Sequence, residues 1–241
     1  MSGSDQPVPT IRFTSFIELH HPLHAGVPVW PGDPPVQFSE HARLEREGYF
    51  LRRLSLGEHS GTHLNAPAHF LPQGLAVDQI PPERLVLPAA VMDVRAACAV
   101  DADFALPLEA VYAWEREHGR VPSGCLVILF TGWQERWDAS ARYWNVDPEG
   151  RLRFPGFSLA SARFLIEERG AAGLASDGPG LEPGLDEGFS VNRYLLGRNA
   201  LALENLCRVD RLPAVGATLA IGLLRVEGGS GAPVSILAFL P

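Results

Sequence analysis

Short runs of β-favouring residues recur along the whole chain and constrain its fold more than any other sequence feature. They are rich in Val, Leu, Ile and Phe, which are typical of buried or half-buried strands. We expect strands at 13–19, 50–56, 86–94, 126–130, 200–203, 219–225 and 234–240. Several runs follow one another with no helical segment between them, which argues against a regular alternation of strand and helix.

Helix signals are fewer than strand signals. Residues 107–118 begin with a proline and are followed by Gly119, while residues 158–169 begin with a serine N-cap and are followed by Gly170. A third, shorter helix is expected at 191–196. These elements together predict an α/β fold: a single mixed α/β domain with a distorted β-barrel-like strand core flanked by helices.

The glycines and prolines give no sign of a second domain. The 24 Gly and 21 Pro are spread along the whole length, and no repeat or low-complexity tract interrupts the chain. We therefore expect a flexible N-terminus over residues 1–12 and one catalytic domain over residues 13–241.

The charged residues exclude several kinds of function. All 20 basic residues are Arg, so the chain has no Schiff-base lysine, Ser-Lys dyad or P-loop lysine. The 28 acidic residues give a net charge of -8, and the longest basic run is the pair Arg52-Arg53. This balance argues against nucleic acid or an anionic membrane as a partner. A small-molecule substrate and no nucleotide cofactor are expected.

The cysteines and the termini point to the cytoplasm. The three Cys are far apart and form no C-x-x-C spacing, so we expect neither a disulfide framework nor a thiolate zinc site. The first residues lack the features of a signal peptide, and no later segment has about 18 uninterrupted apolar residues. We interpret the protein as cytoplasmic.

The densest chemistry in the sequence is one histidine-rich segment. His59, His63 and His69 lie within eleven residues, and in an extended chain they share a face with Asn65, because side chains alternate with period two. Imidazole nitrogens with one oxygen ligand suit Zn²⁺ or Mn²⁺. The alternative is that the histidines are separate hydrogen-bonding residues in a polar loop. The N-terminal cluster at 20–24 is expected to be a surface turn.

The histidine segment cannot be straight if its side chains share one ion. A straight strand from 59 to 69 would span about 33 Å at about 3.3 Å per residue, far more than one metal site covers. Gly61 and Pro67 disfavour a helix and are where the chain can bend.

The segment S-G-T-H-L-N-A-P-A-H-F resembles the H-x-G-T-H-x-D-x-P-x-H-F signature of the metal-dependent cyclase superfamily. That superfamily includes bacterial kynurenine formamidases, isatin hydrolases and proteins described as polyketide cyclases. The resemblance continues over most of the chain, at 30–34, 131–133, 154–158, 173–177, 204–206 and 231–234. It implies a homodimer or homotetramer.

The resemblance also implies roles for individual residues. His59, His63 and the residue at 65 would bind metal, His69 would be a catalytic acid or base, and Glu204 a second-site ligand or catalytic carboxylate. Three further residues, each at a position the family pattern covers, are expected to bind substrate: Trp30, Ser176 and Asn192. Trp30 is the preferred aromatic wall, whereas Trp133 and Trp137 are expected mainly in the core.

Two departures from the family pattern concern the metal. The Asp of the signature is Asn65 here, and the downstream His of the family is Asn192. Replacing an anionic ligand by a neutral one raises the net charge at the ion and weakens its binding. We therefore expect one divalent metal at most, Zn²⁺ or Mn²⁺, held weakly or absent.

Three hypotheses for function follow. The first is a metal-dependent hydrolase acting on an amide, lactam or lactone carbonyl of a small aromatic substrate through activated water. The second is a biosynthetic cyclase that closes a ring on a polyketide-like chain by aldol or dehydrative chemistry. The third is a catalytically silent, metal-poor family member that binds a ligand. Metal analysis separates the third from the others, and turnover of small amides separates the first two.

Overall fold

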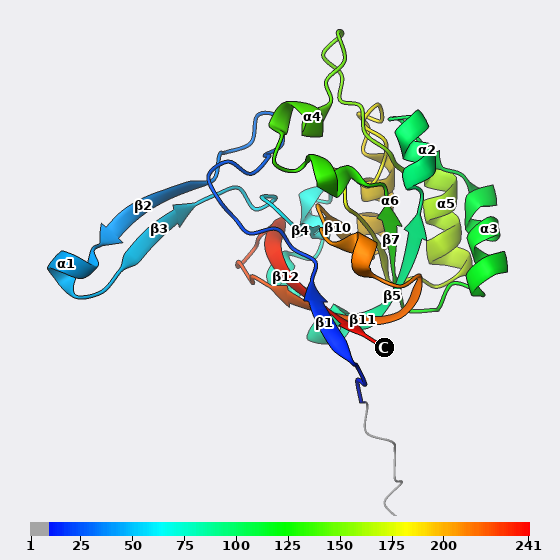
Figure 1. The fold of residues 1–241 in the computed structure, drawn as a ribbon, viewed down its shortest axis with the longest axis horizontal. Helices are drawn as coiled ribbons and strands as arrows, with labels where there is room; N and C mark the ends of the chain where they lie inside the picture. The colour runs from blue at the N-terminus through cyan, green and yellow to red at the C-terminus, as the bar shows by residue number, and fades with distance from the viewer. Residues whose placement is uncertain (1–9) are drawn as a thin grey trace, which may run out of the picture.

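A sheet whose two ends meet forms the centre of the molecule (Figure 1). The computed structural model describes residues 10–241, so most of the predicted flexible N-terminus lies outside the described residues. The strands are β1 (Ser15–Glu18), β2 (Gln37–Ala42), β3 (Leu51–Ser55), β4 (His63–Asn65), β5 (Val86–Asp93), β6 (Ala105–Leu106), β7 (Leu126–Phe130), β8 (Gly156–Phe157), β9 (Gly173–Ser176), β10 (Leu201–Glu204), β11 (Val215–Leu223) and β12 (Gly231–Leu240). The α-helices are α1 (Leu44–Glu47), α2 (Arg95–Val100), α3 (Leu108–His118), α4 (Ser140–Trp144), α5 (Leu159–Arg163) and α6 (Ser190–Gly197).

The long last strand, β12, closes the barrel. One edge of β12 pairs with β11, and the other pairs with β4 near its start and with β1 near its end. The strand order β12-β11-β5-β7-β9-β10-β4 therefore returns to β12, which makes a closed barrel of seven strands in the described part of the chain. The predicted barrel-like core flanked by helices is confirmed.

Half of the barrel is parallel, and helices cover that half from outside. Strands β5, β7, β9 and β10 run parallel, and α3, α5 and α6 connect them (Figure 1). Parallel strands covered on both faces read as continuous apolar runs. Strand β7 shows this, because Leu126 and Ile128 belong to the interior cluster while Val127 and Leu129 pack toward the helices. The predicted strand at 126–130 is confirmed with its limits unchanged.

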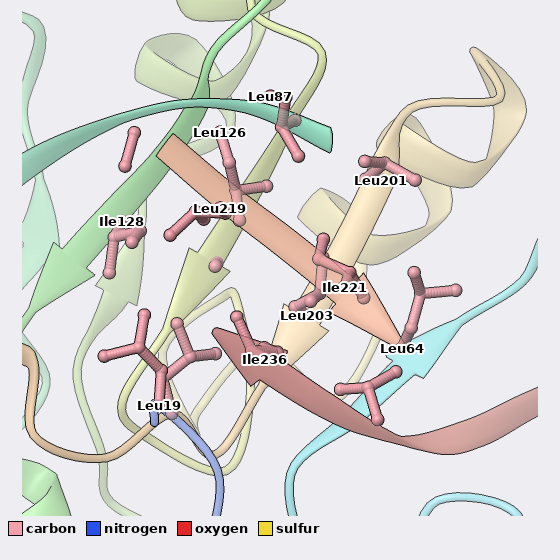
Figure 2. Close-up of a cluster of buried hydrophobic side chains, with 14 of the residues drawn as sticks. Leu19, Leu64, Leu87, Leu126, Ile128, Leu201, Leu203, Leu219, Ile221 and Ile236 are labelled. Atoms are coloured by element: carbon pink, nitrogen blue, oxygen red, sulfur yellow. The ribbon is translucent and has the colours of Figure 1, made fainter. Parts of the chain in front are cut away.

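Aliphatic side chains fill the barrel interior (Figure 2). Leu64 from β4, Leu203 from β10 and Ile236 from β12 meet there, together with residues from β5, β7 and β11. Because Leu64 and Leu203 point inward, their neighbours along the two strands point outward. That alternation places the polar residues of β4 and β10 on the outer surface of the barrel wall.

An arm made of β2, α1 and β3 extends away from the barrel (Figure 1). Its two strands pair with each other and not with the barrel. The predicted strand at 50–56 is confirmed, but its partner is a strand that the sequence did not reveal. Within residues 10–241, no helix has the length and apolar character needed to cross a bilayer.

The predicted helices are confirmed with one change of geometry. Residues 107–118 and 191–196 match α3 and α6 closely. The helix predicted at 158–169 begins at the Ser158 N-cap, whose side chain accepts a hydrogen bond from Ser161 N, but it passes from α5 into a π-helical turn over Phe164–Glu168. Wider turns of this kind are a recognised irregularity of α-helices.

Candidate active site

Two polar residues of β4 and one of β10 form the base of the site. His63 and Asn65 flank the inward-pointing Leu64, and both are buried on the outer face of the barrel wall. In the antiparallel register His63 lies directly opposite Glu204. Directly opposed side chains are within reach of each other, and His63 Nε2 is 3.3 Å from Glu204 Oε2.

The chain bends on both sides of β4, as the sequence predicts. Gly61 has a φ of +68°, a conformation that favours glycine, and Pro67 begins a 3₁₀ turn over Pro67–His69. The first bend brings His59 back beside His63, with ring centroids 5.3 Å apart. Gly231 makes room for it, because an added Cβ there would lie 2.5 Å from His59 Cε1.

His59 is held from two sides. Its Nδ1 is 2.7 Å from Asn65 Oδ1, and its Nε2 is 3.0 Å from Ser230 Oγ. Ser230 Oγ in turn donates to Glu58 Oε2 at 2.5 Å, and Ser230 N donates to the same oxygen at 2.8 Å. A hydroxyl that donates to a carboxylate has only lone pairs left for the imidazole, so His59 Nε2 carries the proton of this contact.

A second group of contacts links two carboxamides and two carboxylates. Asn65 Nδ2 donates to Glu204 Oε1 at 3.0 Å and to Asn192 Oδ1 at 3.1 Å. Asn192 Nδ2 donates to Glu204 Oε1 and to Glu182 Oε1, each at 3.0 Å. Asn192 N donates to Glu182 Oε2 at 2.9 Å. All four side chains are buried, and each polar end has a partner, as buried polar groups require.

Burial and charge shift the pKa values of this cluster in different directions. Burial, reinforced by the neighbouring imidazoles, lowers the pKa of His59 to about 4. Burial also tends to lower the pKa of His63, but the hydrogen bond to Glu204, the charge of that carboxylate and the contact with Gly61 O together raise it. Burial would raise the pKa of Glu204, yet the contact with His63 lowers it. Burial raises the pKa of Glu182 to about 7. Near neutral pH, His59 is therefore neutral and Glu204 ionised.

A cavity of about 220 Å³ opens onto these residues. Its polar lining includes Asp33, His59, His63, Asn65, His69, Glu182, Asn192 and Glu204. Its aromatic lining is Trp30, Phe70, Trp144 and Phe189. The rings of Trp30 and Phe189 are 5.9 Å apart, and those of Phe70 and Phe189 are 5.5 Å apart. An apolar cavity with a few convergent polar groups is the usual form of a small-molecule site.

His69 lies at the mouth of this cavity. Its ring centroid is 4.0 Å from that of His59 and 4.3 Å from that of Phe70, and the residue is exposed. Burial lowers its pKa, the nearby charge of Glu204 raises it, and the net direction is down. A neutral imidazole beside solvent is able to take up and release a proton.

The structure brings together most of the residues predicted for the site, but not all. Ser176, predicted to bind substrate, is fully buried outside the cavity lining, and its Oγ accepts a hydrogen bond from Gly178 N. The predicted role of Ser176 in substrate binding therefore stays a prediction, and Gly178, which follows β9, lies against its side chain. Trp133 and Trp137 lie in a core cluster, as expected.

Among the lining or supporting residues that were not predicted as site residues are Asp33, Glu58, Glu182 and Ser230. Ser230 has no histidine near it in the sequence, and closure of β12 against β4 brings it to His59. Glu182 belongs to the glycine-rich run 178–184, which suggested only a loop. The one sequence signal that could have identified Glu182 as a site residue is that it is a glutamate in a loop without basic neighbours.

The donor atoms at the site fit a divalent cation. Neutral His59, protonated on Nε2, presents a lone pair to Asn65 Oδ1 at 2.7 Å. His63 Nδ1 donates to Gly61 O at 2.9 Å, and His63 Nε2 lies 3.3 Å from Glu204 Oε2, which favours a proton on Nε2 that a cation bound to this nitrogen would displace. At the His59–Asn65 contact two acceptors meet, and a proton or a cation has to compensate them. Ligands of one tetrahedral Zn²⁺ with bonds of about 2.0 to 2.1 Å lie about 3.4 Å apart, so His59 Nδ1 and Asn65 Oδ1 would have to separate by about 0.7 Å to share an ion.

The oxygen ligand would be a neutral one. Within residues 10–241, no three His, Cys, Asp or Glu side chains are grouped so that they could hold one ion. A site built on His59 and His63 therefore depends on the amide oxygen of Asn65. Imidazole and amide donors are compatible with Zn²⁺ or Mn²⁺ but lack the charge of a carboxylate.

Comparisons with known proteins agree with this architecture. The Cyclase family model, described as "Putative cyclase", matches residues 17–183. Isatin hydrolase from Roseibium aggregatum is 32% identical over 219 residues, which cover 86% of this chain and 82% of that protein. Kynurenine formamidase from Salinibacter ruber is 28% identical over 223 residues, covering 91% and 95%.

A solved structure extends the likeness to the fold. The crystal structure of an isatin hydrolase bound to the product analogue thioisatinate has a TM-score of 0.88 and 29% identity, covering 94% of this chain and 92% of that chain. The relatives named here are hydrolases. The model match and the identity to a full-length relative place this chain in the Cyclase family.

Proposed function

We propose that this protein hydrolyses the carbonyl–nitrogen bond of a small aromatic amide or lactam, using one divalent cation held by His59, His63 and Asn65. The observation that carries the proposal is the 2.7 Å contact of His59 Nδ1 with Asn65 Oδ1 beside a cavity with aromatic walls. When bound, a divalent cation supplies Lewis acidity toward a carbonyl and lowers the pKa of water.

The substrate is small and at least partly aromatic. The cavity volume of about 220 Å³ is below the usual range of about 300 to 1,000 Å³ for ligand sites. Trp30 and Phe189 provide faces against which a planar ring packs. Isatin contains a lactam fused to a benzene ring, and isatin hydrolase is among the relatives. Both facts favour a bicyclic lactam or an anilide of similar size.

His69 is the group best placed to move protons. Hydrolysis requires a base that takes a proton from the attacking water and an acid that protonates the leaving nitrogen as the carbon–nitrogen bond breaks. His69 has a lowered pKa and stands at the mouth of the cavity beside His59. Glu204 already accepts hydrogen bonds from two carboxamides and faces His63, so its role is to orient these groups.

Turnover of isatin and N-formylkynurenine by the purified full-length protein tests this proposal. We expect ring opening of isatin or deformylation of N-formylkynurenine, loss of the activity with a chelator and recovery with Zn²⁺ or Mn²⁺. His69→Gln should lower kcat while metal binding stays unchanged, and His118→Gln, a remote histidine on α3, is the matched control. Metal-loaded protein that turns over neither compound contradicts the proposal.

A further inference from the structure

An asparagine in place of an aspartate creates a problem of orientation. Both oxygens of a carboxylate are able to bind a cation, but a carboxamide has one oxygen and one NH₂ group that repels it. Residue 65 serves the proposed function, on which this inference rests, only if Oδ1 is turned toward His59. The neighbours of Asn65 show what keeps its amide in this orientation.

Asn192 is held by a carboxylate that neither the sequence pattern nor the proposed reaction uses. Glu182 Oε1 accepts from Asn192 Nδ2 at 3.0 Å, and Glu182 Oε2 accepts from Asn192 N at 2.9 Å. The two contacts fix the backbone and the carboxamide of Asn192 together. Rotating the amide by half a turn would set Asn192 Oδ1 against the oxygens of Glu182 and Glu204.

The fixed amide of Asn192 passes its orientation to Asn65. Asn192 Oδ1 accepts from Asn65 Nδ2 at 3.1 Å, and Glu204 Oε1 accepts from the same nitrogen at 3.0 Å. With both acceptors on its nitrogen side, Asn65 has its oxygen on the other side, 2.7 Å from His59 Nδ1. A rotated Asn65 would set its amide oxygen against Glu204 Oε1 and Asn192 Oδ1, and buried acceptors that face each other without a donor are strongly unfavourable.

Glu182 itself is firmly placed. It is only 3% exposed, and Phe157 N of β8 donates to Leu181 O at 2.7 Å. Gly156 lies directly against the Glu182 backbone, where a larger residue would collide with it. The carboxylate also meets backbone N–H at the start of α6, which has no side-chain cap from Phe189. Negative charge is favourable at that end of a helix.

We propose that Glu182 is a positioning residue that acts through Asn192 to present the oxygen of Asn65 to the metal. This chain thereby recovers, by orientation, part of the cation affinity that an aspartate would supply by charge. Glu182 touches neither the substrate nor the ion in this scheme. Its effect on metal binding is transmitted by the carboxamides of Asn192 and Asn65. This transmitted effect should disappear when residue 65 is an aspartate, because either carboxylate oxygen is able to bind the ion.

A double-mutant cycle on metal affinity tests the inference. Binding of Mn²⁺ to the full chain is measured by calorimetry at pH 8, above the Glu182 pKa of about 7, for the wild type, Glu182→Gln, Asn65→Asp and the double variant. Glutamine places an NH₂ group against one of the two Asn192 donors, so we expect Glu182→Gln to weaken binding about tenfold with Asn65 present. In the Asn65→Asp background, Glu182→Gln should weaken Mn²⁺ binding by about threefold or less, because only the missing negative charge of Glu182 still has an effect.

The controls separate a transmitted effect from loss of structure. Glu115→Gln is the matched control, because Glu115 also accepts from a backbone N–H and from a side chain, Arg169, far from the cavity; it should leave affinity unchanged. If Glu182→Gln does not fold, Asn192→Ala removes only the carboxamide link and keeps the backbone N–H to Glu182. It should show the same dependence on residue 65.

The outcomes are distinct. Equal losses with Asn65 present and in the Asn65→Asp background, or no loss at all, overturn the role of Glu182 while the proposed metal site stands. A wild-type chain that binds neither Mn²⁺ nor Zn²⁺ overturns the proposed function and the inference with it. A loss confined to chains that keep Asn65 supports both.

Discussion

Two histidine-rich stretches of this chain lie in different structural surroundings. In the segment from 59 to 69 the rings of His59, His63 and His69 face one cavity. In the stretch from 20 to 24 each histidine has its own surroundings: Ile236 N donates to His20 Nδ1, the His21 ring stacks on Trp137 at 3.9 Å, and Gly26 N donates to His24 Nδ1. Density of histidine in the sequence therefore does not define a site.

The pKa values do not distinguish the two stretches either. Burial lowers the pKa of both His21 and His59 to about 4. The Nε2 atom of His21 is the one buried side-chain polar atom without a hydrogen-bond partner in residues 10–241. The difference is one of placement, because β4 is closed between β10 and β12 while residues 20–24 lie beyond the end of β1. Strand pairing places a carboxylate directly opposite His63, whereas His21 lies outside the strands.

Removing one imidazole ring from each histidine stretch should give the largest difference between the two stretches in metal binding and activity. His63→Ala deletes an imidazole that we propose as a metal ligand, so metal retention should be lost and kcat/KM should fall more than about a hundredfold, beyond the loss typical of residues that only support a ligand. His21→Ala should leave both unchanged within about twofold. Metal content by mass spectrometry and initial rates check this. Equal metal content in both variants contradicts the ligand role of His63.

Lowering the pH should show how much the buried, neutral ring of His21, outside the site, destabilises the folded protein. His21 has a folded-state pKa of about 4 against an ordinary value of 6.5, because burial disfavours its charged form. The unfolded chain then binds more protons between these values, so His21 favours unfolding progressively as the pH falls from 6.5 to 4. The full effect is about 3 kcal/mol.

His21→Phe isolates this contribution. Phenylalanine keeps a ring against Trp137 and cannot be protonated, so the variant should unfold at higher denaturant concentration than the wild type, with the difference growing as the pH falls. Denaturant unfolding of both chains with chelator at pH 7.5, 5.5 and 4.5 measures it, and chelation keeps metal binding out of the comparison. A difference that does not change with pH would show that His21 titrates normally.

The comparison of the two histidine stretches also shows which features of the site can be predicted from the sequence. The alternation that placed His63 and Asn65 on one face holds because Leu64 is a core residue of the barrel, and period-two patterning is a local property. The bends at Gly61 and Pro67 were also predictable, since glycine and proline have strong local preferences. The continuous apolar run of β7 identified a strand buried on both faces for the same reason.

The contacts that complete the site were not predictable from local patterns. Ser230 meets His59 across 171 positions, and Glu182 meets Asn192 from a loop with no periodicity. Both depend on closure of the barrel and on the path of loops, which are properties of the whole chain. The position of Ser176 outside the cavity lining was unpredictable for the same reason: its strand was recognisable, but the path of the chain after the strand was not.

Two glycines provide a smaller, matched test of the comparison. An added Cβ at Gly231 would lie 2.5 Å from His59 Cε1, whereas at Gly26 it would lie 3.3 Å from His24 Nδ1. Gly231→Ala should therefore displace the His59 ring, weaken metal binding about tenfold and destabilise the fold by about 1 to 3 kcal/mol. Gly26→Ala should change stability by less than about 0.5 kcal/mol. Metal binding that survives in Gly231→Ala would place His59 outside the ligand set.

Ser230→Ala should give the smallest effect, because it removes one support of His59 and no ligand. Without the hydroxyl, His59 loses the acceptor on its Nε2 side and Glu58 loses one of its two donors from Ser230; the contact of His59 Nδ1 with Asn65 remains. A hydrogen bond of this kind contributes about 1 kcal/mol, so metal affinity should fall about fivefold.

Ser235→Ala, which disturbs the contact of a serine with His20, is the counterpart in the other stretch and should leave metal affinity unchanged. If the two serine variants behave alike in metal calorimetry, the tautomer assigned to His59 from its contact with Ser230 is wrong, and with it the lone pair that we direct toward the cation.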